Sequence, residues 1–460
     1  MSRAAGYRCS VCDRTFGISE VTYTCPHDGG NLDVLLDIEA IRREHSPETI
    51  GRSRETSLWR YLPLLPVEDP EHEGTALRAA GWTPLLEARR LAGDLGLRNV
   101  WLKDDGRNPT ASFKDRASAV VVARAQEIGA ETVVTASTGN AGAALAGMAA
   151  AAGQPAVILA PKTAPQAKVA QLLVFGAKVF LVDGTYDQAF DLTLEASKAF
   201  GWYCRNTGYN PFTAEGKKTA AFEICEQMTL EVGVGAKHAV SHPVRAASPR
   251  KRSERRGPPG RDGRRAAGLR GTNGGVPLHW TSPDAVFVSV GDGNIISGLH
   301  KGFRDLLDLG WIERMPRLYG IQSTGSAAIA GAFERGTETI EPVHADTLAD
   351  SISVDLPRDG LRGLRAATRT NGAYLTVTDA EILAAISTLG RREAVFAEPA
   401  GAAGYAGLMK AVVQSRVGPD ERIVVMVTGS GLKDVRAAMQ AVGEAVIIPP
   451  SLDALQRALA

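Results

Sequence analysis

Short apolar strands alternate with helices through much of this chain, and this alternation constrains the fold more than any other feature. In the first half, the pattern predicts strands at 99–103, 132–136, 156–160, 178–183 and 202–205, separated by helices at 112–128, 141–152, 165–175 and 186–200. Such alternation is typical of βαβ units, whose parallel strands are buried on both faces beneath helices. The chain is therefore expected to be an α/β protein.

The alternation resumes in the second half, after a break at 233–282. There the pattern predicts strands at 285–290, 318–322 and 423–427, and helices at 295–309, 327–335, 379–392 and 403–414. Two separate α/β runs in a chain of 460 residues indicate two open sheet domains rather than one.

The break itself is strongly basic. Residues 237–270 contain eleven Lys and Arg and two acidic residues, whereas the rest of the chain has 41 basic and 49 acidic residues. A segment so rich in Arg, Pro and Gly buries too little apolar surface to offset the entropy of ordering it. We therefore predict a disordered basic insertion at 233–282 in an otherwise mildly acidic protein.

Three interpretations of this insertion stay open. They are an idle insertion, a basic arm that binds nucleic acid, and a stretch translated out of frame, which would explain the abrupt change of composition. Because charge runs are most often simply solvated, nucleic acid is not the favoured partner. A stretch translated out of frame could disorder the glycine-rich turn near residue 291 and leave the product inactive.

The segment 1–50 carries a Cys-rich pattern. Cys9-x-x-Cys12 is followed by Cys25, with His27 and Asp28 where a second Cys-x-x-Cys pair would end. The pattern resembles a zinc ribbon, in which two Cys pairs hold one tetrahedral ion. We take Cys9, Cys12, Cys25 and His27 as candidate zinc ligands, with Asp28 as the other possible fourth ligand. The alternative is a ribbon that has lost its metal and is held by packing.

Cysteine usage and hydropathy indicate a cytoplasmic protein. Five cysteines in 460 residues are too few for a disulfide framework. Residues 1–10 lack the apolar core of a signal peptide, and the longest apolar stretch, 141–152, is too short to span a bilayer. We expect reduced thiols and no membrane partner.

Four turns rich in Gly, Ser and Thr lie near the ends of predicted strands, where open α/β sheets bind their ligands. The first contains Ser112-Phe113-Lys114-Asp115, and Ser112 is expected to cap the following helix. Lys114 would then lie in the first helical turn, where the helix dipole and burial lower the pKa of an amine and favour Schiff-base chemistry. The alternative is an ordinary lysine whose amine reaches water.

The other three turns offer groups that bind anions or polar rings. Ser137-Thr138-Gly139-Asn140 opens a helix, where backbone N–H groups suit a carboxylate. Gly291-Asp292-Gly293-Asn294 directs N–H groups at a phosphate, provided that the Asp292 carboxylate points away. Thr428-Gly429-Ser430-Gly431 follows an apolar strand and places a hydroxyl at its end.

Taken together, the motifs resemble the threonine synthases, pyridoxal-phosphate (PLP) enzymes of fold type II, the fold of the tryptophan synthase β subunit. The resemblance runs from about Gly81 to Val442 outside the insertion, and it includes Trp82-Thr83-Pro84-Leu85, Glu398-Pro399-Ala400 and the turn from Thr428 to Asp434. It implies a large PLP-binding domain at 51–113 and 205–450, a small α/β domain at 114–204, and a homodimer.

The resemblance also implies a role for each site residue. Lys114 would bind PLP as an aldimine and move the substrate Cα proton, while Asn140 would contact the ring hydroxyl and Thr428 the ring nitrogen. The cofactor phosphate would be held by Gly291, Asp292, Gly293, Asn294 and Ile295. The substrate carboxylate would be bound by Ser137, Thr138 and Gly139. The implied reaction converts O-phospho-L-homoserine and water to L-threonine and phosphate.

Two departures from the family pattern keep an alternative open, namely another fold-type-II enzyme such as a cysteate synthase or a threonine/serine ammonia-lyase. The phosphate turn is one residue shorter than usual. Thr213 stands near a position where many members have an Arg that helps to bind the substrate phosphate. The cations that could replace it are Lys217, Lys218, Lys162 and Arg116.

Overall fold

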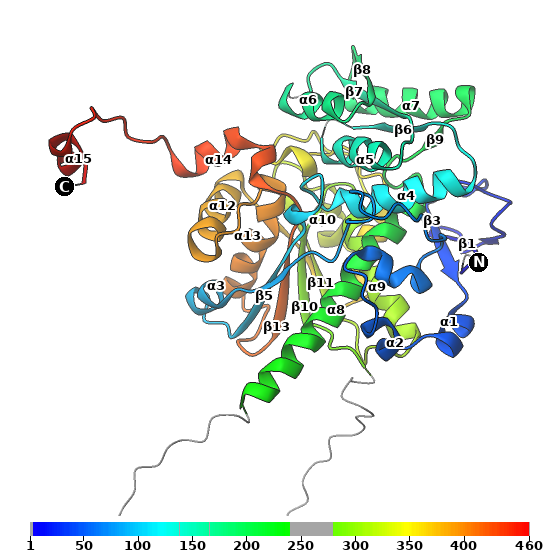
Figure 1. Cartoon of the computed structure of the whole chain (residues 1–460), viewed down its shortest axis with the longest axis horizontal. Helices are drawn as coiled ribbons and strands as arrows, with labels where there is room; N and C mark the ends of the chain where they lie inside the picture. The colour runs from blue at the N-terminus through cyan, green and yellow to red at the C-terminus, as the bar shows by residue number, and fades with distance from the viewer. Residues whose placement is uncertain (1–2, 138, 165, 240–278, 460) are drawn as a thin grey trace, which may run out of the picture.

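The computed structural model describes residues 3–137, 139–164, 166–239 and 279–459, which form an α/β structure with three sheets (Figure 1). Two of the sheets are the open sheets expected from the alternating pattern, and the third lies at the N-terminus. Most of the predicted insertion at 233–282 falls outside the described residues.

The larger sheet has six strands in the order β12-β11-β10-β13-β5-β4. These are β12 (Ala373–Val377), β11 (Arg317–Ser323), β10 (Ala285–Ser289), β13 (Arg422–Val427), β5 (Asn99–Asp104) and β4 (Leu85–Glu87). All neighbouring strands are parallel except β4, which forms an antiparallel edge with β5. Val286 and Val288 of β10 pack on one face and Ala285 and Phe287 on the other. This two-sided burial explains why the strand sequences are continuously apolar.

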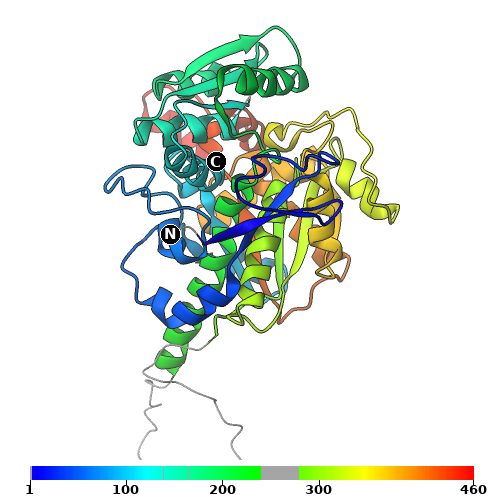
Figure 2. The ribbon, with the colours of Figure 1, turned by 90° about the vertical axis from the view of Figure 1, so that its right-hand side faces the viewer.

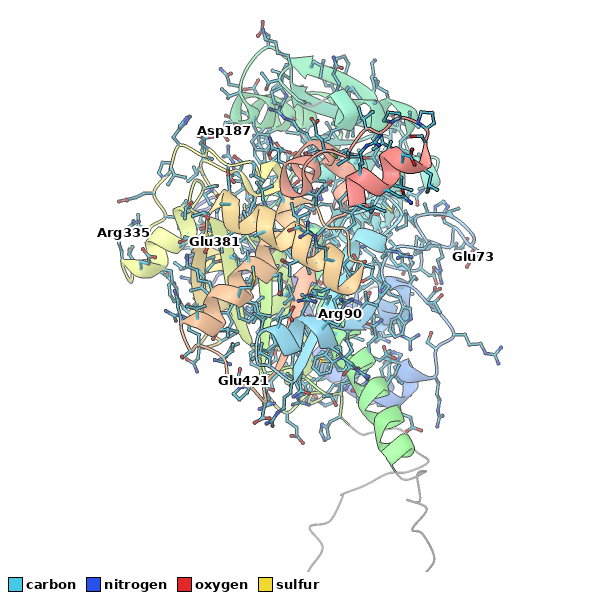
Figure 3. All side chains as sticks on the ribbon, turned by 90° about the vertical axis from the view of Figure 1, so that its left-hand side faces the viewer. Glu73, Arg90, Asp187, Arg335, Glu381 and Glu421 are labelled. Atoms are coloured by element: carbon cyan, nitrogen blue, oxygen red, sulfur yellow. The ribbon has the colours of Figure 1, made fainter. Side chains whose placement is uncertain are left out.

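Helices cover both faces of this sheet. One face packs against α8 (Phe212–Ala239), α9 (Asn294–Asp308), α10 (Ala328–Glu334) and α11 (Gly360–Thr368). The other packs against α3 (Arg89–Asp94), α12 (Asp379–Glu393) and α13 (Pro399–Val413). Charged side chains such as Arg90 and Glu381 lie on the outer surfaces of these helices (Figure 3).

The smaller sheet has four parallel strands in the order β8-β7-β6-β9. This part of the chain, coloured cyan to green, lies at the top of Figure 2. These are β8 (Lys178–Val182), β7 (Ala156–Pro161), β6 (Val133–Ala136) and β9 (Tyr203–Cys204). Its helices are α4 (Lys114–Glu127), α5 (Asn140–Ala151), α6 (Gln166–Val174) and α7 (Tyr186–Phe200).

The predicted strands and helices are present in both sheets, with small shifts at their ends. The largest shift is in α13, which begins at Pro399 rather than near residue 403, because the fixed φ of proline suits the first helical turn. β4, β12 and α11 are among the elements that were not predicted, and β4, with three residues, is too short to show a clear period.

The N-terminal segment forms an antiparallel sheet in the order β2-β1-β3. Its elements are β1 (Ala4–Cys9), β2 (Thr15–Phe16) and β3 (Leu32–Leu36), followed by α1 (Ile38–Glu44), α2 (Pro47–Gly51) and the 3₁₀ helix η1 (Leu58–Leu64). Tyr7 and Val34 are buried in the same core as Val120 of α4 and Leu145 of α5. The segment is therefore docked against the rest of the chain by apolar packing.

The C-terminal end leaves the body of the molecule. α14 (Val435–Val442) packs on α12, and the chain then extends outward to α15 (Leu452–Leu459) (Figure 1). Three short 3₁₀ helices complete the fold, namely η2 (Asp105–Arg107), η3 (Asp350–Ile352) and η4 (Gly431–Lys433). Among the described residues, no helix is both long and apolar enough to cross a membrane.

A buried charge network fixes the start of α4. Arg116 Nη2 donates to Asp105 Oδ1 and to Glu223 Oε2, each at 2.8 Å, and Lys103 Nζ lies 2.7 Å from Glu223 Oε2. All four side chains are fully buried. Because the four residues come from β5, η2, α4 and α8, the network ties the first turn of α4 to the larger sheet and its helices.

Candidate active site

A cavity of about 360 Å³ is bordered by the residues that follow the C-terminal ends of β6, β10 and β13. Every described residue that the sequence assigned to cofactor or substrate binding lines it, namely Lys114, Ser137, Gly139, Asn140, Gly291, Asp292, Gly293, Asn294, Ile295 and Thr428. Thr138 lies outside the described residues. The fold thus brings together turns that are more than three hundred residues apart in the sequence, such as those of Lys114 and Thr428.

Two of these turns are joined directly by backbone hydrogen bonds. Phe113 N donates to Thr428 O at 2.9 Å, and Ser430 N donates to Ala111 O at 3.1 Å. Lys114 therefore enters the cavity next to Thr428. The predicted helix cap is wrong, because Phe113 occupies the N-cap position and the buried Ser112 Oγ has no hydrogen-bond partner among the described residues.

The Lys114 amine is placed in surroundings that disfavour its charge. Desolvation by the surrounding protein and the positive charge of Arg205 lower the pKa of Lys114 to about 8, against the opposing effect of Asp292 and Glu398. No carboxylate among the described residues forms a salt bridge with it. A lysine in this state supplies a neutral, nucleophilic amine near physiological pH.

The turn before α9 has free backbone donors. No partner among the described residues accepts a hydrogen bond from the N–H groups of residues 291–295. Gly293 has φ of +90°, and a Cβ at this position would lie 2.6 Å from Asp359 O, so the turn requires glycine. Asp292 Oδ1 accepts a hydrogen bond from Arg358 N at 3.1 Å. The turn has the free donors that a phosphate needs at a helix N-terminus.

Asn140 meets a carboxylate that the sequence did not single out for a role. Its Nδ2 donates to Glu398 Oε1 at 2.7 Å, while its Oδ1 is buried without a partner among the described residues. Burial raises the pKa of Glu398. A Cβ on Gly429 would lie 2.3 Å from Glu398 Oε1, so only glycine leaves room for this carboxylate. The signal in the sequence was the Glu398-Pro399 start of α13, next to the turn at Thr428.

The structure distinguishes among the cations that were considered for binding the substrate phosphate. Lys217 lines the cavity. Lys218 instead pairs with Glu215 at 2.6 Å and Asp305 at 2.9 Å, and Arg116 belongs to the network described above. Lys162 pairs with Asp183 at the surface.

The Cys-rich segment brings together four side chains that could hold a metal ion, and they differ from the predicted set in one residue. One ligand atom from each of Cys9, Cys12, Cys25 and Asp28 lies within 4.8 Å of the others. His27 is not in this cluster, because its ring stacks on Phe16 with centroids 6.1 Å apart. Gly30 N donates to Asp28 Oδ1 at 2.8 Å, which holds that carboxylate toward the thiols. Asp28 therefore takes the fourth place that His27 was expected to fill.

Residues 76–245 and 276–429 match the family model described as "Pyridoxal-phosphate dependent enzyme". The chain is 36% identical to the threonine synthase of Methanocaldococcus jannaschii over 454 residues, which are 98% of each chain. It is 33% identical to the threonine synthase of Synechocystis sp. over 404 residues, which are 87% of this chain and 89% of that one.

Solved structures agree on the fold. The processed form of threonine deaminase isoform 2 from Solanum lycopersicum has a TM-score of 0.58 at 21% identity, over 78% of this chain and 83% of that one. O-ureido-L-serine synthase has a TM-score of 0.58 at 18% identity, over 84% of this chain and 99% of that one.

The sheets and the cavity at their strand ends are those of the pyridoxal-phosphate dependent enzymes, and the chain belongs to that family. Its similarity over nearly the full length places it, within that family, among the threonine synthases. The residues present fit the cofactor, because the turn before α9 offers free N–H groups to a phosphate and Lys114 offers an amine of lowered pKa to an aldehyde. The unpartnered Oδ1 of Asn140 is available to a ring hydroxyl.

Proposed function

We propose that this chain converts O-phospho-L-homoserine and water to L-threonine and phosphate. The observation that carries the proposal is the convergence of Lys114, the turn at 137–140, the turn at 291–295 and Thr428 on one cavity, in a chain similar to threonine synthases over 98% of its length. PLP, when bound, supplies the electron sink that stabilises negative charge at the substrate Cα.

Lys114 is proposed to hold the cofactor and then to move the Cα proton. Its lowered pKa supports both tasks, since a neutral amine can attack an aldehyde and can also accept a proton. Phe113, next to Lys114, donates a hydrogen bond to the turn that contains Thr428, and the Thr428 hydroxyl would contact the ring nitrogen of PLP. A hydroxyl at this place leaves that nitrogen largely unprotonated, in contrast to a carboxylate.

The two helix N-termini are proposed to divide the anionic groups between them. The N–H groups of Gly291, Asp292, Gly293, Asn294 and Ile295 would hold the cofactor phosphate at the start of α9. Ser137, Thr138 and Gly139 would hold the substrate carboxylate at the start of α5, with Asn140 toward the ring hydroxyl.

The test is turnover of the purified, PLP-loaded chain with O-phospho-L-homoserine. We expect L-threonine and inorganic phosphate in equal amounts, and no turnover with Lys114→Ala. Formation of 2-oxobutyrate from L-threonine, without any phosphate release from O-phospho-L-homoserine, would contradict the proposal.

We also propose a structural zinc ion between Cys9, Cys12, Cys25 and Asp28. Cys9 Sγ lies 3.3 Å from Asp28 Oδ1, and Cys12 Sγ lies 3.8 Å from Cys25 Sγ, which supports a set of four ligands around one ion. Elemental analysis of dialysed protein should give one zinc per chain. Asp28→Ala should lower this content, while His27→Ala, the matched control, should retain it; the reverse pattern would contradict the proposed ligand set.

A domain division and a homodimer in the cytoplasm complete the proposal. Residues 51–113 and 205–450 would form the large PLP-binding domain and 114–204 the small one, a division that the two open sheets support. The C-terminal arm supports a dimer, because Val446, Ile447, Leu452 and Leu459 are 68–96% exposed on a segment that extends from the body. Light scattering should give twice the chain mass, and removing 444–460 should shift the chain toward monomer.

A further inference from the structure

We propose that Lys217 and Arg205 bind the phosphate ester of the substrate, in place of the arginine that Thr213 replaces. The inference rests on the proposed function and deepens it, because it assigns the recognition of a phosphate dianion to two cations of this chain.

Lys217 lies near the start of α8 and is fully buried, yet it lines the cavity. Its Nζ donates to Asn294 Oδ1, and Asn294 Nδ2 donates to Asp359 Oδ2 at 2.6 Å. Gly298 makes this approach of α8 and α9 possible, since a Cβ there would lie 2.7 Å from Lys217 Cβ. Burial and the charges of Lys114 and Arg205 lower the pKa of Lys217 well below its ordinary value. A bound anion would offset these costs.

Arg205 follows β9 and is also fully buried. Its Nη1 donates to Thr207 Oγ1 at 2.8 Å, and Thr207 lines the cavity. Its Nη2 is buried and has no hydrogen-bond partner among the described residues. Desolvation lowers the pKa of Arg205 to about 10. Arg205 itself does not line the cavity, and its Nε donates to Ser118 Oγ at 3.3 Å. Its guanidinium therefore has one unpartnered donor and is one hydrogen bond away from the lining residue Thr207.

These two cations differ from the other buried cations of the chain. The structure describes eight Lys and Arg residues as buried, and six of them form salt bridges with carboxylates: Arg60, Lys103, Arg116, Lys218, Lys301 and Arg362. Lys217 and Arg205 form none with any described residue. Burying a charge without a partner is costly, so two such charges beside one cavity indicate that the missing partner is an anionic ligand.

The substrate phosphate fits this place better than the cofactor phosphate. The free N–H groups of 291–295 already suit the cofactor phosphate at the start of α9. Lys217, on α8, donates a hydrogen bond to Asn294 at the end of that turn. Arg205, which follows β9, donates a hydrogen bond to Thr207. The phosphate dianion of the substrate would be the anionic partner that Lys217 and Arg205 lack among the described residues.

The test uses Lys217→Gln and Arg205→Gln in the PLP-loaded enzyme, with Lys217→Arg and Arg205→Lys as charge-conserving variants. Lys162→Gln is the matched control, because Lys162 pairs with Asp183 at the surface. Three quantities are measured: the Kd of PLP by absorbance titration of the apoenzyme, the Kd of inorganic phosphate for the holoenzyme by calorimetry, and KM and kcat with O-phospho-L-homoserine.

We expect each Gln variant to raise the phosphate Kd and the KM roughly 10- to 100-fold, as for the loss of a charged hydrogen bond, with little change in the PLP Kd. The charge-conserving variants should retain part of the affinity. A weaker PLP Kd with unchanged phosphate binding would overturn the proposal and assign the cations to the cofactor. Unchanged values throughout would also overturn it. Phosphate binding that depends on Lys217 in an enzyme without turnover would support the phosphate site and contradict only the proposed reaction.

Discussion

Asn140 Nδ2 donates a hydrogen bond to Glu398 Oε1 at 2.7 Å, and this bond joins the first residue of α5 to the cap of α13. One helix packs on the smaller sheet and the other on the larger sheet. Both residues line the cavity, so the bond connects the helices of the two sheets in its wall and sets the orientation of the amide that faces the proposed cofactor site. It also explains why residue 429 is glycine, because a side chain there would overlap the Glu398 carboxylate.

Gly429→Ala should lower activity through this contact. The added Cβ would lie 2.3 Å from Glu398 Oε1, so the carboxylate must move and release Asn140. We expect a fall in kcat of at least about tenfold and a loss of roughly 1–3 kcal/mol in the free energy of unfolding, as for other overpacked sites. Gly418→Ala is the control, since its Cβ would have no contact closer than 3.6 Å. Equal kcat values for the two variants would contradict this role of Gly429.

Lys114→Ala should abolish the visible absorbance of the enzyme-bound cofactor as well as the activity. The reason is that Lys114 has a lowered pKa and follows Phe113, which is hydrogen-bonded to the Thr428 turn. Lys217 also lines the cavity, but its amine donates a hydrogen bond to Asn294. Lys162→Ala should keep both properties because its side chain lies at the surface. A yellow Lys114→Ala protein with a spectrum like that of the unchanged chain would assign the cofactor to another lysine.

The rate of cofactor uptake by the apoenzyme should rise with pH. The pKa of Lys114 is lowered to about 8, so the amine is mostly protonated below this pH and mostly neutral above it. Uptake of PLP, followed by absorbance in stopped flow, should increase through about pH 8 and then level off. In Arg205→Gln the midpoint should move upward, because a positive charge that lowers the pKa of Lys114 is removed. A midpoint that stays unchanged would contradict the electrostatic contribution of Arg205.

Arg116→Leu should destabilise the protein far more than an exposed substitution. Removing the guanidinium leaves Asp105 buried without its cation and leaves Glu223 paired with Lys103 alone. We expect a loss of about 3–5 kcal/mol in the free energy of unfolding, measured by denaturant titration. Arg98→Ala should lose less than about 1 kcal/mol, since its pair with Asp420 is exposed. Similar losses in the two variants would show that the buried network contributes little.

Much of this architecture could be predicted from the sequence, for a physical reason. Strands such as Ala285–Ser289 are buried on both faces, so their apolar runs stand out, and the glycine-rich turns that follow them reveal the cavity. Short edge elements such as β4 carry no such signal.

The roles of single side chains were harder to predict, because they depend on partners distant in sequence. Arg205 stands out because its buried Nη2 has no hydrogen-bond partner among the described residues. Glu398 stands out because it accepts a hydrogen bond from Asn140. Asp28 groups with the three thiols while the His27 ring contacts Phe16 and Gly30 N donates to Asp28, and the spacing of the cysteines does not record these contacts. The contact between Asn140 and Glu398 joins residues 258 positions apart, which local patterns do not record.

The long helix α8 has one more consequence, which concerns where this enzyme can be altered. Lys217 lies near its start and Ala239 ends it, roughly 33 Å further along at 1.5 Å per residue. The chain is next described at His279 and enters β10 at Ala285, at the strand end opposite the turn at 291–295. The basic stretch therefore joins the body at the edge remote from the chemistry. That junction is a natural site for a cut, a fusion or a label, and an enzyme assembled there from two separate polypeptides should keep an intact cavity.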